Sequence, residues 1–94
     1  LIHVVIDNEV YESTGSQRSL SEKIKLEQVA KSSGYKNILR VEKKEEIKEA
    51  FLKLKELAGP NFLLIKVEPG FDSSTGRVTH TPEEITERFM NAIA

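Results

Sequence analysis

The chain has 94 residues, enough for one small domain, and its 14 basic and 15 acidic residues give a net charge of −1. This balance removes the usual electrostatic basis for binding nucleic acid or an anionic membrane. The absence of cysteine excludes disulfides and cysteine nucleophiles; no apolar run is long enough to span a membrane, so we expect a cytoplasmic location.

The first predicted element is a strand over residues 1–6, which are apolar except for His3. A nearly continuous apolar run is typical of a strand covered on both faces in a parallel sheet. Such a strand also needs neighbours at its edges. We therefore expect a preceding segment or a second chain to lie beside it.

A short helix is predicted next, from the apolar spacing of Leu26, Val29 and Ala30, and Gly34 is placed to end it in a left-handed cap. Asn37–Val41 predicts a short strand. From Lys43 onwards apolar residues recur at helical spacing until Gly59-Pro60 ends the pattern. These residues are Ile47, Ala50, Phe51, Leu54, Leu57 and Ala58.

Residues 62–67, FLLIKV, predict a buried central strand. The loop over residues 68–80 is long, and loops of this length are often functional. Thr81, Pro82 and Glu84 then form a capping-box pattern with proline at the first helical position, which predicts a last helix. Its apolar face carries Ile85, Phe89 and Ile93.

Strands that alternate with helices indicate parallel pairing through right-handed crossovers. We therefore predict an α/β fold for residues 1–94, a single small three-layer domain with a mainly parallel sheet. Three strands make a thin core, and the apolar edges of the sheet favour a homo- or hetero-oligomer.

Ligands of open parallel sheets bind beyond the carboxyl ends of the strands, and Asp7 and Asn8 follow the first strand at that end. Their oxygen atoms suit a hard cation such as Mg²⁺, which keeps only one or two protein ligands. The alternative is an Asx turn that closes the strand, and spacing alone favours the turn.

Four segments of the chain, taken in order, resemble the carboxyl-terminal part of the phosphonopyruvate decarboxylases and the related sulfopyruvate decarboxylases. They are IDNEVYESTGSQ, KIKLEQVAKSSGY, GPNFLLIKVEPG and GRVTHTPEEITERFM. The resemblance covers essentially all 94 residues. It implies a portion of a thiamine diphosphate-binding fold, with thiamine diphosphate and Mg²⁺ as cofactors in a completed assembly.

The resemblance also implies roles for particular residues. The Asn8 side-chain oxygen and the Val10 carbonyl would bind Mg²⁺, and Tyr11 would join them in holding the cofactor. Ser13, Thr14, Gly15 and Gln17 would border the substrate pocket, while Asp7 would orient the turn. No catalytic residue is assigned to this chain.

The chain departs from the family pattern at several positions. Ser16 stands where glycine is usual, Arg18 and Ser19 stand where proline and threonine are usual, and Val78 replaces a proline after Gly76 and Arg77. The Gly-Asp-Gly signature and the glutamate that activates the cofactor have no counterpart. We therefore expect this chain to be inactive until a complementary subunit or N-terminal segment completes the site.

Two rival functions remain open. One is a non-catalytic α/β interaction domain, which could form a dimer by pairing its sheet edges. The other is a regulatory phosphate-binding module, which is disfavoured because no glycine-rich phosphate loop is present. His3 and His80 lack partners at metal-ligand spacing, Ser13 lacks a neighbouring base, and Arg77 is expected to be solvent-exposed. The charged run EKKEEIKEA is expected to be a solvated helix face.

Overall fold

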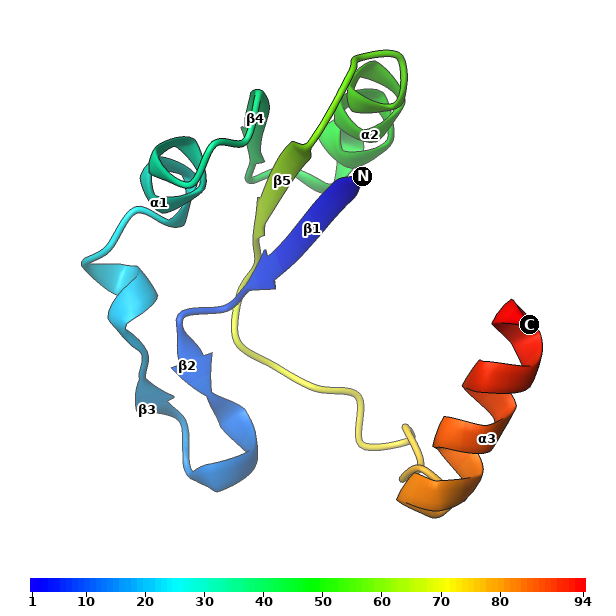
Figure 1. Cartoon of the computed structure of the whole chain (residues 1–94). Coiled ribbons are helices and arrows are strands. Elements are labelled where there is room, and N and C mark those ends of the chain that lie inside the picture. Colours follow the sequence, from blue (N-terminus) through cyan, green and yellow to red (C-terminus); the bar gives the residue numbers. More distant parts are fainter.

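The computed structural model describes all residues 1–94 and shows a parallel sheet between two helices, with a hairpin at one end and a third helix apart (Figure 1). The strands are β1 (Ile2–Asp7), β2 (Val10–Tyr11), β3 (Gln17–Arg18), β4 (Asn37–Val41) and β5 (Asn61–Lys66), and the α-helices are α1 (Leu26–Ser32), α2 (Ile47–Lys55) and α3 (Pro82–Ile93). Three 3₁₀ turns cover Glu12–Thr14, Leu20–Glu22 and Lys44–Glu46.

The main sheet has the order β1-β5-β4, and both pairings are parallel. Strand β5 is central, as the run FLLIKV predicts, and its residues 62–65 are all buried. The predicted α/β class with a mainly parallel sheet is confirmed.

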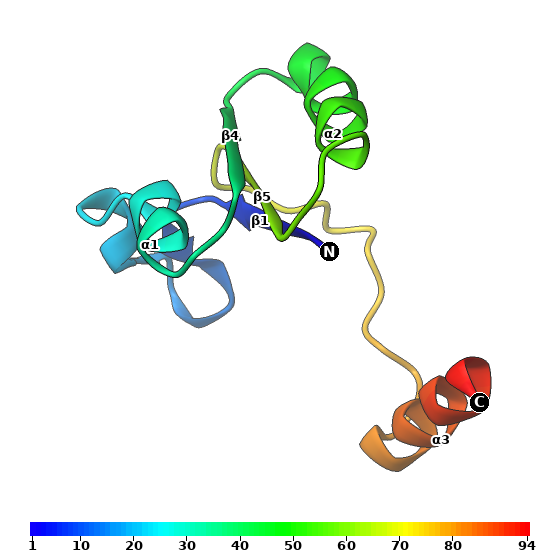
Figure 2. The same cartoon turned by 45° about the horizontal axis from the view of Figure 1, so that its top comes forward.

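The two faces of β5 build the two halves of the core. Leu63 and Ile65 pack with Leu54 of α2, whereas Phe62 and Leu64 pack with Ala30 of α1. Figure 2 shows α1 and α2 on opposite sides of the sheet. This is the predicted three-layer arrangement.

Strand β1 differs from the prediction, because it is not covered on both faces. Val4 and Ile6 are 40% and 69% exposed. They pair in register with Leu63 and Ile65 and so share the face that α2 covers, but α2 packs mainly over β4 and β5, and Ile2 is the residue of β1 that reaches its core cluster. The outer edge of β1 also has no strand partner within the chain.

The buried side chain of Asn61 ties together the amino end of the sheet. Its Nδ2 donates to the carbonyls of Leu54 and Leu57, at 2.8 and 3.0 Å, and so satisfies the end of α2. Its Oδ1 accepts a 2.8 Å hydrogen bond from Asn37 Nδ2, at the start of β4. Its backbone N–H donates to the Leu1 carbonyl at 2.9 Å.

The predicted helices are present, but α2 is shorter than its apolar pattern. The helix begins at Ile47, because Lys44–Glu46 form a 3₁₀ turn, and it ends at Lys55. The Leu57 N–H bonds back three residues to the Leu54 carbonyl, so the last turn tightens before Gly59. Helix α1 ends as predicted, with Gly34 in the left-handed region at φ +93°.

Helix α3 has the predicted capping box. Thr81 Oγ1 accepts from the Glu84 N–H at 3.2 Å, and the Glu84 carboxylate accepts from the Thr81 N–H at 2.8 Å. The helix stands clear of the sheet at the end of a long linker, and none of its residues is buried (Figures 1 and 2). No helix in the chain has both the length and the apolar character that a membrane crossing requires.

Candidate functional site

A hollow of about 890 Å³ lies at the carboxyl ends of the three parallel strands. Each strand contributes to it the residues that follow its last sheet pair. Asn8 and Val10 come from the end of β1, Lys43 from the end of β4, and Val67 from the end of β5. This is where ligands of open parallel sheets bind.

Asp7 and Asn8 close β1 with two consecutive Asx-type hydrogen bonds. Asp7 Oδ1 accepts from the Glu9 N–H at 2.9 Å, and Asn8 Oδ1 accepts from the Val10 N–H at 3.1 Å. The Asx turn that spacing alone favours is therefore present. An amide oxygen has two lone pairs, so Asn8 Oδ1 keeps one for a further partner.

The Val10 carbonyl is also available to a ligand. Glu9 and Ser19 form a hydrogen-bonded position of the short β2-β3 hairpin, through the 2.8 Å bond from the Ser19 N–H to the Glu9 carbonyl. The next pair, Val10 and Arg18, is therefore a non-hydrogen-bonded pair whose carbonyls point out of the ladder. The donor set fits a hard cation, but two protein oxygens need further ligands to complete an octahedron.

No group of three or more histidine, aspartate or glutamate side chains is placed to hold a metal ion. A hard cation at Asn8 and Val10 would therefore need further ligands that the histidine, aspartate and glutamate side chains of this chain do not supply.

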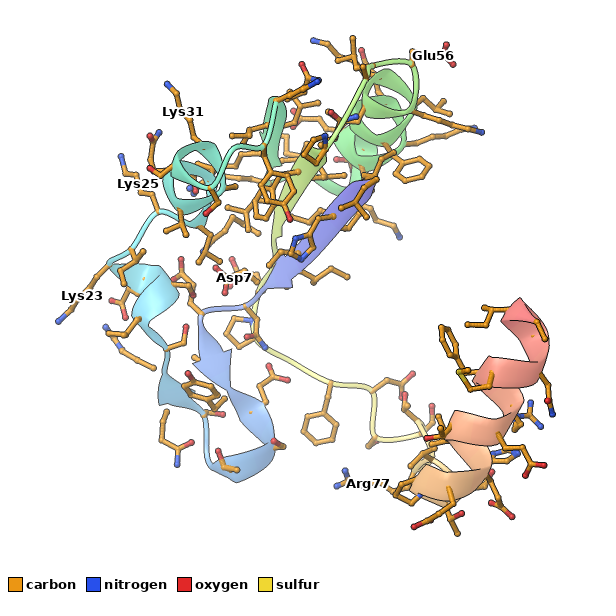
Figure 3. The ribbon with its side chains drawn as sticks, in the orientation of Figure 1. Asp7, Lys23, Lys25, Lys31, Glu56 and Arg77 are labelled. Carbon is orange, nitrogen blue, oxygen red and sulfur yellow. The ribbon has the colours of Figure 1, made fainter.

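Behind these oxygens lies a polar cluster centred on Lys66, the last residue of β5. Its Nζ donates to Asp7 Oδ2 at 2.7 Å and also pairs with the Glu9 carboxylate. The other Asp7 oxygen accepts a 2.7 Å hydrogen bond from Ser21 Oγ. Figure 3 shows Asp7 at the end of β1, directed toward the segment that contains this serine.

The electrostatics of this cluster favour the charged form of both partners. Burial alone raises the pKa of Asp7, but hydrogen bonds from Lys66, Ser21 and the Glu9 N–H outweigh it and hold that pKa below its ordinary value. Burial likewise lowers the pKa of Lys66, and the hydrogen bonds to Asp7 and Glu9 outweigh it and raise that pKa. The pair therefore stays ionised within the protein.

The cluster fixes an uncommon backbone conformation in the turn. Glu9 adopts φ +63°, the left-handed region that non-glycine residues seldom occupy. Its carboxylate is paired with Lys66 while its N–H bonds to Asp7, so both sides of the residue are held. The placement of Asn8 and Val10 thus depends on contacts with a strand 59 residues away along the chain.

The other predicted site residues lie on the β2-β3 hairpin. Ser13 borders a second hollow, of about 590 Å³, between the hairpin and the linker, where it is joined by Phe71 and Arg77. Thr14 and Gln17 instead bond to each other across the tip, Thr14 Oγ1 to Gln17 Oε1 at 2.9 Å and Gln17 Nε2 to the Thr14 carbonyl at 2.8 Å. These two residues and Gly15 line neither hollow.

Tyr11 is exposed and also borders neither hollow. Ser16, which stands at a glycine position of the family pattern, has φ +57°. This is a conformation that glycine adopts more readily than serine. Arg77 lies on the exposed linker before α3, as expected (Figure 3).

The two histidines have no metal-site environment. His3 Nδ1 lies 2.8 Å from Tyr35 Oη, and its ring packs edge-on against Phe62. His80 lies in the exposed loop, where Nδ1 is 3.3 Å from Thr79 Oγ1.

Sequence reasoning missed Lys66, although a signal was present. It is the single charged residue in the run FLLIKV, at the point where the strand reaches the functional end of the sheet. A buried charge needs a partner, so this lysine predicts a carboxylate at the end of a neighbouring strand.

No protein-family model matches the chain. Among curated proteins, it is 34% identical to the phosphonopyruvate decarboxylase of Streptomyces viridochromogenes, over 95% of this chain and 22% of the relative. It is 35% identical to the sulfopyruvate decarboxylase of Methanosarcina acetivorans, over 99% of this chain and 24% of the relative.

A third relative is the sulfopyruvate decarboxylase subunit beta of Methanothermobacter thermautotrophicus, which is 33% identical over 99% of this chain and 47% of the relative. The chain thus spans about a quarter to a half of the length of these relatives. Over almost its whole length the chain is similar to a part of phosphonopyruvate and sulfopyruvate decarboxylases, the family that its sequence segments resemble.

Proposed function

We propose that this chain forms part of the cofactor site of a thiamine diphosphate- and Mg²⁺-dependent 2-oxo acid decarboxylase that acts on phosphonopyruvate or sulfopyruvate. The observation that carries the proposal is the hollow at the carboxyl ends of the strands, which Asn8 and Val10 line in a homologue of these decarboxylases. When bound, thiamine diphosphate supplies the electron sink that decarboxylation of a 2-oxo acid needs.

The residues of this chain hold and orient the cofactor. Asn8 Oδ1 and the Val10 carbonyl would hold Mg²⁺, which would supply positive charge for the diphosphate. Lys43 and Lys44 also line the hollow and form no ion pair within the chain, as does the acidic Glu68, so two lysines and one glutamate are left to meet a ligand there. Ser13, which lines the second hollow, would border the substrate.

The chain contributes one wall of the site and carries out no step alone. This chain supplies two Mg²⁺ ligands. A complementary subunit or N-terminal segment supplies the remaining protein ligands and the group that activates the cofactor. The isolated chain is therefore expected to leave phosphonopyruvate and sulfopyruvate unchanged.

A thermal-shift titration with Mg²⁺ and thiamine diphosphate tests the proposal. We expect the ligands to stabilise the chain only in the presence of a complementary polypeptide that carries the Gly-Asp-Gly signature. A ligand at a hundred times its dissociation constant adds about 2.7 kcal/mol to the free energy of unfolding. Asn8→Ala should abolish this ligand-dependent gain, whereas Asn91→Ala, on the exposed helix α3, should retain it.

A non-catalytic interaction domain is the second candidate, and the uncovered apolar side chains of β1 and α3 favour it. Such a domain would show no ligand-dependent stabilisation with or without the complement. That result, or an equal gain in the Asn8→Ala variant, would exclude the proposed cofactor site.

A further inference from the structure

Helix α3 exposes a complete apolar face. Ile85, Phe89 and Ile93 lie along one side of it and Met90 lies next to them, and all four are exposed. The helix has 12 residues, and isolated helices of this length are marginally stable in water even with good caps. A docking surface would supply the stability that the capping box alone does not.

A second uncovered apolar surface lies on β1. The side chains of Val4 and Ile6 face the α2 side of the sheet, where α2 does not reach them. We call these two residues the β1 strip. A helix laid beside α2 would cover the strip and complete that layer of the fold.

The winding of the chain places a following helix on this side. The step from β4 to β5 passes through α2 and moves toward β1, whereas the step from β1 to β4 passes through α1 and moves the opposite way. When two right-handed crossovers run in opposite directions along a sheet, their helices lie on opposite faces of the sheet. A helix after β5 that led toward β1 and on to a further parallel strand would, by the same rule, lie on the α2 face, which is the face that carries the β1 strip.

Charge complementarity favours the same position. Helix α3 has three acidic side chains and one basic, a net charge of −2, and α2 has three lysines and one glutamate, a net charge of +2. The acidic residues are Glu83, Glu84 and Glu87, and the lysines are Lys48, Lys53 and Lys55. Neighbouring helices with opposite net charge attract each other and select this partner over like-charged surfaces.

The linker leads α3 away from the sheet of its own chain. The Val67 N–H donates to the Asp7 carbonyl at 3.0 Å, and the Gly70 N–H then donates to the Glu12 carboxylate on the hairpin. These bonds carry the chain out past the carboxyl end of the sheet before α3 begins, and α3 makes no packing contact with β1 (Figures 1 and 2).

We propose that α3 docks on the β1 strip of a second copy of this chain, and that two copies exchange this helix reciprocally. Every copy carries both surfaces, so a two-fold dimer covers two helices and two strips with contacts of one kind. Exchange of a terminal helix requires no refolding of the sheet. The inference does not depend on the proposed cofactor site.

Sedimentation equilibrium with two charge variants tests the exchange. We expect the unaltered chain to form dimers, and both Phe89→Asp and Ile6→Asp to weaken the dimer by roughly a hundredfold or more, because each buries an unpaired carboxylate. Asn91→Asp adds the same charge on the opposite face of α3 and should leave the dimer intact. Circular dichroism checks that the sheet and helices remain folded in all three variants.

Mixing the two disrupted variants separates exchange from docking within one chain. In a mixed dimer, the intact α3 of the Ile6→Asp chain meets the intact strip of the Phe89→Asp chain. One contact is thus restored, and mixed dimers should form where neither variant dimerises alone. A monomeric unaltered chain, a dimer that survives Phe89→Asp, or a mixture that remains monomeric would each overturn the proposal.

Discussion

At the scale of single residues, Lys66 determines the geometry of the candidate site. It connects the end of β5 to Asp7 and Glu9, so it sets the turn that carries Asn8 and Val10. Lys66 forms no hydrogen bond with Asn8 Oδ1 or with the Val10 carbonyl, the two oxygens proposed to bind Mg²⁺. It therefore acts as a positioning residue.

We expect Lys66→Met to lower the free energy of unfolding by roughly 2–3 kcal/mol, because it leaves the buried Asp7 carboxylate without its cation. Urea denaturation measures the loss. Lys53→Met removes an exposed lysine from α2 and should change stability by less than about 0.5 kcal/mol. Equal effects of the two substitutions would show that the cluster does not hold the turn.

A second residue-scale prediction concerns Glu27, whose Oε1 accepts a 3.0 Å hydrogen bond from Arg40 Nη1. A hydrogen bond from its own backbone N–H lowers the pKa of Glu27, and burial opposes this effect. The hydrogen bond from Arg40 lowers the pKa further, so it lies below its ordinary value of 4.5. A carboxyl with a lowered folded-state pKa stabilises the protein above its unfolded-state pKa, and this stabilisation is lost as the pH falls through the folded-state pKa.

Glu27→Gln should therefore reduce stability at neutral pH, and the difference from the unaltered chain should shrink as the pH falls below 4.5. Denaturation midpoints measured at a series of pH values give this difference. Glu45→Gln removes a carboxylate that is exposed and unpaired, and it should produce no such convergence. A pH-independent difference for Glu27→Gln would contradict the expectation.

At the scale of elements, the β2-β3 hairpin depends on a tip that turns in the left-handed region. Gly15 has φ +116° and Ser16 has φ +57°. Gly15→Ala should destabilise the protein by about 1–2 kcal/mol, because a side chain is strained at that φ. Gly76→Ala, at a glycine with open space and no positive φ, is the matched control and should be close to neutral.

The elements also show which features a sequence pattern can predict. The predictions of a strand at Asn37–Val41 and of a capping box at Thr81 are confirmed, because the sequence signals for both are local. The hairpin was missed because each of its strands has two residues, too short for any alternation to appear. The prediction that β1 is covered on both faces was wrong, because an apolar run indicates which side chains avoid water but not which helix packs over them.

The candidate site divides in the same way. The position of Asn8 beyond a parallel strand follows from local order, and the structure places it in the hollow. The Lys66 cluster joins residues 59 positions apart, so only the sheet order brings it together. Ser13 and Asn8 were grouped by a family resemblance, and the structure places them in two separate hollows.

At the scale of the whole molecule, protection from solvent is concentrated in β5. This strand is paired on both edges and covered on both faces, whereas α3 is uncovered. We expect amide hydrogen exchange to be slowest at Leu63 and Leu64 and fastest, among the regular elements, in α3 at concentrations where the chain is monomeric. Exchange of α3 amides as slow as that of β5 in the monomer would mean that the helix packs on its own chain.

Asn61 gives the sheet two ends of different character. At the amino end, the buried side-chain amide of Asn61 joins the start of β4 to the end of α2, and its backbone N–H holds the first residue of the chain. At the opposite end the fastening is ionic, because Lys66 pairs with Asp7 and Glu9 and so joins the end of β5 to the end of β1. Substitutions at exposed positions of the rim, such as Lys43 and Lys44, can therefore change the charge around the hollow while the sheet beneath it stays the same.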